Sequence, residues 1–172
     1  MFPDEYFFYA EDTYLSFKAK FLGYKILHNS NSFVEHFGGS TTNNFKNSFV
    51  TYYQERNRIL NFLIFFSLGF RIKYYPILLQ NFYLKIIYGL FTKKYPFIGI
   101  IKAYYWILSN SKWIKEQRII AHQNKIKPEN DIFCFLSGKV ANGDNVFEKV
   151  LNFINLTYLR LVNIKTIELN KK

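Results

Sequence analysis

The residues best suited to chemistry lie in the first third of the chain, and a pair of carboxylates comes first. Glu11 and Asp12 form this pair, within the stretch from Asp4 to Thr41. A carboxylate within hydrogen-bond reach of a hydroxyl can take its proton while that hydroxyl attacks a substrate. Acidic side chains are also favoured at the start of a helix, where backbone N–H groups are unpaired. The pair by itself therefore fits two interpretations, a general base or a plain helix start.

Two other groups of side chains are suited to binding phosphate. Gly38, Gly39 and Ser40 follow His36 in a small polar loop, and such a loop can offer N–H groups and hydroxyls to a diphosphate. Arg56 and Arg58 lie in a Tyr-Tyr-x-x-Arg-Asn-Arg run, and a guanidinium can bind phosphate through two hydrogen bonds. A flexible turn and a charged helix surface would explain the same residues.

A short helix is predicted to position the acidic pair. Leu15, Ala19 and Leu22 recur at i, i+4 and i+7, so they are expected to share its buried face. Gly23 follows, at the usual place of a left-handed C-terminal cap. Two short strands separated by a polar turn are then predicted at Tyr24–His28 and Phe33–Phe37.

Helices are predicted for the rest of the chain. Their expected ranges are Phe49–Phe70, Ile77–Phe91, Pro96 to about His122, Pro128 to near Gly138, and Val146 to about Leu169. The last helix is expected to bury Val150, Phe153, Ile154, Leu161 and Ile164. The longest uncharged run, Ile59–Phe70, has twelve residues, whereas a membrane-spanning helix needs roughly 20.

Several motifs, in this order, resemble those of the family 2 glycosyltransferases, in particular the bacterial rhamnosyltransferase-like enzymes. They are Phe2–Asp12 (FPDEYFFYAED), Leu15, Gly23-Tyr24, His36–Ser40 (HFGGS) and Tyr52–Arg58 (YYQERNR). The chain departs from the family pattern at Pro3 and Tyr14, where Asp is common, and at Lys18, where Arg is common.

This resemblance implies an α/β fold, the carboxy-terminal part of a GT-A (Rossmann-like) enzyme that is mostly helical after residue 48. It implies that Asp12 is the general base, that Glu11 supports it, and that His36 is a metal ligand. In such enzymes an Asp-x-Asp binds Mn²⁺ or Mg²⁺ beneath the nucleotide sugar. This sequence contains no Asp-x-Asp, and three residues precede Asp4, so the donor-binding half is expected upstream or in a separate chain.

The net charge of +11 lies almost entirely in the middle of the chain. Residues 49–127 contain thirteen Lys or Arg against two acids, whereas residues 1–48 and 128–172 are nearly neutral. Basic side chains among Trp, Tyr and Phe favour helices that lie on an anionic membrane surface, and a bundle packed on a missing half is the alternative. A single cysteine, Cys134, fits a reducing compartment.

Three regions and one function follow as expectations. Residues 1–48 are the acceptor side of a catalytic domain, 49–127 a membrane-interface region, and 128–172 a C-terminal helical segment. The expected activity moves a sugar from a nucleotide donor to a glycan or lipid-linked acceptor on the cytoplasmic face of the membrane. A non-catalytic membrane-surface or assembly module is the rival, and nucleic-acid binding is disfavoured because no recognition motif is present.

Overall fold

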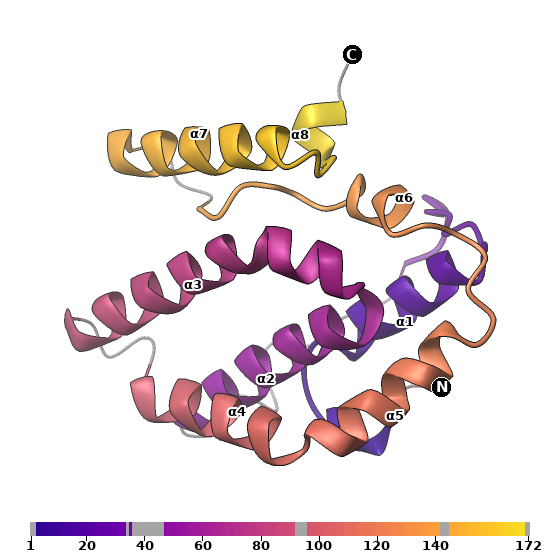
Figure 1. Ribbon diagram of the computed structural model, residues 1–172, viewed down its shortest axis with the longest axis horizontal. Helices are drawn as coiled ribbons and strands as arrows, with labels where there is room; N and C mark the ends of the chain where they lie inside the picture. The colour runs from indigo at the N-terminus through magenta and orange to yellow at the C-terminus, as the bar shows by residue number, and fades with distance from the viewer. Residues whose placement is uncertain (1–2, 34, 36–46, 92–95, 142–144, 171–172) are drawn as a thin grey trace.

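The fold is helical throughout the part of the chain that the structure describes, which is residues 3–33, 35, 47–91, 96–141 and 145–170 of a computed structural model (Figure 1). A 3-10 turn at Asp4–Tyr6 (η1) precedes the helices. They are α1 (Glu11–Phe21), α2 (Asn47–Phe65), α3 (Leu68–Phe91), α4 (Phe97–Ser109), α5 (Ser111–His122), α6 (Asn130–Phe133), α7 (Val146–Leu161) and α8 (Ile167–Asn170).

The expected α/β fold is therefore wrong. No strand occurs among the described residues, and Tyr24–His28 is an exposed irregular segment in place of the first predicted strand. A strand persists only where its backbone N–H and C=O groups pair with those of a neighbouring strand, and residues 3–33 contain no second strand that could pair with Tyr24–His28. The second predicted strand, Phe33–Phe37, lies mostly outside the described residues; Phe33 itself is exposed.

Helix α1 forms as predicted, and Gly23 follows it with a φ of 83°, in the left-handed region that favours glycine. The predicted buried face is wrong, since Leu15 is 41% exposed while Tyr14, Phe17 and Phe21 are buried. Both sets have helical spacing, and the aromatic set removes more apolar surface from water. The three rings pack in the core against Phe65 of α2, with centroids 5.0 to 5.5 Å apart.

Helices α2 and α4 make the most extensive contact between elements of the described chain. Gly99 makes it possible, because a Cβ atom there would lie 2.5 Å from the Ser48 carbonyl oxygen. Helix α5 continues from α4 after a break at Asn110 and also packs on α2 (Figure 1). Helix α3 instead diverges from this group.

The helix boundaries differ from prediction where polar side chains interrupt the backbone ladder. The helix expected over Pro96–His122 breaks at Asn110, whose amide donates to the Trp106 carbonyl at 2.8 Å. The helix expected over Phe49–Phe70 ends at Phe65. Ser67 then binds the Glu129 carboxylate through its N–H (2.8 Å) and its hydroxyl (2.7 Å), and α3 begins at the next residue and continues through Pro76.

Helix α7 presents the opposite face from the one predicted. Val150, Phe153, Ile154 and Leu161 are 52 to 80% exposed, although Ile164 is buried as expected. The inward face carries Asn152, Asn155 and Leu159. Asn152 lies inward because its side chain accepts from the N–H groups of Val140 and Ala141 and donates to the Ala141 carbonyl, so these backbone groups are satisfied.

Within the described ranges, no helix has the length and apolar character needed to cross a membrane.

Candidate functional site

The backbone just before α1 adopts an uncommon conformation. Phe7, Tyr9 and Ala10 have φ values of 37°, 64° and 60°, in or near the left-handed region that non-glycine residues rarely adopt. Each such residue costs on the order of 1–3 kcal/mol and persists only where its surroundings hold it in place. The acidic pair follows this segment directly, at the first two positions of α1.

Two asparagines of α2 hold that segment. The Asn57 side-chain amide lies within hydrogen-bond distance of three carbonyl oxygens, those of Tyr6 (2.8 Å), Phe8 (2.7 Å) and Tyr9 (2.7 Å). Asn61 donates to the Ala10 carbonyl at 3.1 Å and accepts from the Tyr6 hydroxyl at 2.6 Å. Both asparagines are buried, so the entry to α1 is fixed from within the core.

Sequence reasoning assigned no role to these asparagines. They lie one turn apart, on the same face of α2 as the buried Leu60 and Ile64. An amide at i and i+4 on an otherwise apolar face was the signal available, because a buried amide needs partners.

Arg56 is also part of this support. It is 4% exposed, and its guanidinium donates to the Glu5 carbonyl, to Asn57 Oδ1 (2.9 Å) and to the Tyr52 hydroxyl (3.2 Å). It also lies 4.6 Å from the Tyr53 ring centroid and 4.7 Å from that of Trp106. The Arg56 guanidinium, which was expected to bind phosphate, is thus hydrogen-bonded to groups of the protein itself.

Asp12 and Glu11 differ in their surroundings. Asp12 is exposed, and its Oδ1 accepts from the Thr13 backbone N–H at 2.6 Å. Glu11 is half-buried, and its Oε2 is buried with no hydrogen-bond partner among the described residues. Asp12, the carboxylate predicted to be the base, is therefore accessible to a substrate, whereas Glu11 is partly covered by the protein.

A cavity of about 210 Å³ lies beside the start of α1. Ala10, Thr13 and Asn61 line it together with Arg58, whose side chain is 36% exposed. Arg58 donates to Glu55 Oε2 at 2.8 Å, but its Nε is buried with no partner in the described part of the chain. Of the two predicted arginines, Arg58 is the one placed next to a space near the acidic pair.

Glu55 and Lys85 set the charge beside this cavity. Burial alone would raise the pKa of the Glu55 carboxyl, but Arg58 and Lys85 beside it lower the pKa below its usual value. Lys85 comes from α3 and pairs with Glu55 Oε1. One carboxylate thus faces two cations, and of these three charged groups Arg58 is the one that lines the cavity.

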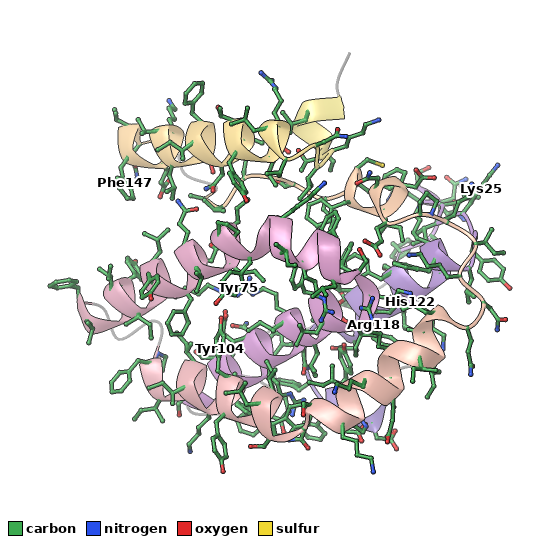
Figure 2. The ribbon with its side chains drawn as sticks, in the orientation of Figure 1. Lys25, Tyr75, Tyr104, Arg118, His122 and Phe147 are labelled. Atoms are coloured by element: carbon green, nitrogen blue, oxygen red, sulfur yellow. The ribbon has the colours of Figure 1, made fainter. Side chains whose placement is uncertain are left out.

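His36, the predicted metal ligand, lies outside the described residues. The predicted phosphate-binding loop, Gly38, Gly39 and Ser40, lies outside them as well. Among the residues that the structure describes, no three His, Cys, Asp or Glu side chains come together as a metal site would require. His122, to which no chemistry was assigned, lies 3.0 Å from the Ile64 carbonyl oxygen through its Nε2. Figure 2 shows His122 and Arg118 directed from α5 toward the end of α2.

Comparison with known proteins finds no matching family model, no matching curated protein and no matching solved structure. The resemblance to the family 2 glycosyltransferases thus stays a prediction based on the motifs themselves.

Proposed function

We propose that this chain is the acceptor-binding, carboxy-terminal portion of an inverting glycosyltransferase. Asp12 acts as the general base, and Glu11 is a positioning residue beside it. The nucleotide-sugar donor is bound by a part of the enzyme that these residues do not supply. The acceptor is a surface glycan or its lipid-linked precursor, at the inner face of the cell membrane.

The observation that carries the proposal is the backbone before α1, locked by Asn57. Conformationally costly backbone is maintained at functional sites because it fixes the position of reactive groups. Here it fixes the origin of the helix on which the exposed Asp12 lies. Ala10 and Thr13, on either side of the acidic pair in sequence, line a cavity that Arg58 also lines. A simple helix start would need only a capping side chain.

In the proposed reaction, the acceptor hydroxyl gives its proton to the Asp12 carboxylate as its oxygen attacks the anomeric carbon. A new C–O bond forms, the bond from that carbon to the nucleotide phosphate breaks, and the nucleoside diphosphate leaves with the electron pair. Arg58, whose side chain is 36% exposed and lines the cavity, stabilises a phosphate oxygen near the site.

The test replaces Asp12 by Asn in the polypeptide that also contains the donor-binding part. Asn keeps the shape of the side chain but cannot accept the proton, so kcat should fall on the order of 10²–10⁴-fold with donor affinity little changed. Asp4→Asn is the matched control, since Asp4 is an exposed acid of η1 and not of α1, and it should leave kcat near the wild-type value. An Asp12→Asn enzyme with near-normal kcat would refute the assignment.

A non-catalytic membrane-surface module is the second candidate, and one observation favours it. Helices α3 and α4 expose large apolar side chains, among them Ile72, Tyr83, Phe91, Ile101 and Tyr105, beside the basic Lys73 and Lys102. This combination suits the headgroup region of an anionic bilayer. Membrane binding without any Asp12-dependent sugar transfer would favour this candidate.

A further inference from the structure

An apolar groove of about 490 Å³ lies between α2, α3 and α4, where α3 diverges from the other two helices. Phe62, Ile72, Leu78, Leu79 and Phe82 line much of it, and Arg71 is the one charged residue among its lining residues. Figure 2 shows Tyr75 of α3 and Tyr104 of α4 directed into the space between these helices. The volume lies within the roughly 300–1,000 Å³ of typical ligand sites.

The groove is open to solvent along α3. Leu68 and Ile72 are each 64% exposed and Tyr75 is 56% exposed, although all three line it. A row of aliphatic and aromatic side chains left in water in this way favours an apolar occupant, since each square ångström of apolar surface covered contributes roughly 25 cal/mol.

Arg71 gives the groove a charge preference. Its side chain is half-buried, and it is the one charged group among the residues that line the groove, so the guanidinium favours an anionic headgroup there. The neighbouring Arg118 is already committed to the carbonyl oxygens of Leu63, Ile64 and Phe66. Helices α3 and α4 contain no Asp or Glu, and Lys85 of α3 is paired with Glu55 of α2, so Arg71 is the charge that the groove presents to a ligand.

We propose that this groove binds one long alkyl or isoprenoid chain of an amphiphile whose phosphate is bound by Arg71. The alkyl or isoprenoid chain would lie between α3 and α4 against Phe62, Leu79 and Phe82, and the phosphate headgroup would lie at the α2–α3 end of the groove. A single chain fits better than a peptide, because an apolar wall leaves peptide amide groups without hydrogen-bond partners.

The binding itself requires no sugar transfer and is independent of Asp12. Only the further identification of this amphiphile as the lipid-linked acceptor rests on the proposed function. Phe62 and Leu78 line both the groove and the smaller cavity beside Arg58, so the two spaces are neighbours. Binding experiments and activity measurements can therefore fail separately.

The test measures the affinity of dodecyl phosphate for the purified chain by titration calorimetry, below the concentration at which the probe forms micelles. Leu79→Trp fills the groove and should weaken dodecyl phosphate binding at least about tenfold, since the dodecyl group then competes with the indole ring for the same space. Arg71→Gln should weaken dodecyl phosphate binding about tenfold and leave dodecanol binding nearly unchanged, because only the charged hydrogen bond is lost. Leu161→Trp, at an 80% exposed position of α7 outside the groove, is the matched control and should bind like wild type.

Circular dichroism of each variant establishes that it is folded, and the probe should broaden or shift the NMR signals of Tyr75 and Tyr104 but not those of Phe147 on α7. Three results would overturn the proposal. They are no saturable binding by the wild-type chain, equal weakening by Leu79→Trp and Leu161→Trp, and a wild-type dimer that Leu79→Trp dissociates, which would make the groove an interface between two copies.

Discussion

Asn57 is the residue whose side chain does most to shape the candidate site. It is fully buried, and its amide donates to carbonyl oxygens just before and within the uncommon backbone that precedes α1. Removing it takes the Asn57 donor from each of those oxygens, and a carbonyl left buried without any donor costs about 1–3 kcal/mol. The consequence should be seen in the stability of the fold as well as in activity.

We predict that Asn57→Ala lowers the free energy of unfolding by about 3 kcal/mol, measured by urea denaturation. Asn57→Asp should be at least as damaging, because it keeps the shape but replaces two donors with a carboxylate that faces carbonyl oxygens. Asn124→Ala is the control, since Asn124 is exposed, and it should change stability by less than about 0.5 kcal/mol. Equal effects of Asn57→Ala and Asn124→Ala would mean that the hydrogen bonds to the segment contribute nothing.

At this scale the sequence identified residue types better than roles. Asp12 lies at the start of a helix and is exposed, as both interpretations of the acidic pair required. Arg56 and Arg58 could not be separated by sequence, because two arginines two residues apart on a helix differ only in what packs beside them. The structure directs Arg56 to Glu5 and Trp106 and places Arg58 at a cavity.

At the scale of helices, the approach of α4 to α2 depends on one glycine. A Cβ atom at Gly99 would lie 2.5 Å from the Ser48 carbonyl oxygen and 3.1 Å from the Tyr52 nitrogen, and both are backbone atoms that move little. The pairing of these helices carries Trp106 to the Arg56 guanidinium, so a shift of α4 would also disturb the support of the segment before α1.

We predict opposite effects for two substitutions of glycine by alanine in helices. Gly99→Ala should lower the free energy of unfolding by about 1–3 kcal/mol, as overpacking does. Gly69→Ala, in α3 with nothing within 4 Å of the added Cβ, should raise it by about 0.5–1 kcal/mol through lower flexibility of the unfolded chain. Thermal unfolding of the two variants beside wild type tests the pair, and a stabilised Gly99→Ala variant would show that α2 and α4 are not packed this closely.

The helices could be predicted from periodicity, but their ends and faces could not. Helix α7 has a clear apolar stripe, and yet the structure turns Asn152 inward because the backbone of Val140 and Ala141 needs partners. Such long-range hydrogen bonds leave no trace in local sequence. The predicted strand at Tyr24–His28 failed for a similar reason, because a strand depends on a partner and not only on its own composition.

At the scale of the whole molecule, charge and exposed apolar surface coincide on α3 and α4. Sequence composition located the charge between residues 49 and 127, and the structure places exposed bases such as Lys73 and Lys102 beside exposed Ile72 and Ile101. The apolar face of α7, with Phe147 and Phe153, is exposed as well but carries no comparable excess of charge. Electrostatic attraction to an anionic surface should therefore act through α3 and α4.

The prediction is that the chain cosediments with vesicles rich in anionic phospholipid, and that the bound fraction falls as salt rises from about 0.05 to about 0.5 M, where screening shortens the range of charge interactions. Each base near such a surface contributes about 1 kcal/mol, so Lys102→Gln should lower the partition coefficient roughly fivefold. Lys165→Gln removes an exposed base in the nearly neutral C-terminal region and should have little effect, which makes it the matched control. Equal partitioning into neutral vesicles at every salt concentration would leave the apolar surface as the cause and exclude the electrostatic one. Equal losses for the two lysine variants would instead show that net charge matters and that its position on α4 does not.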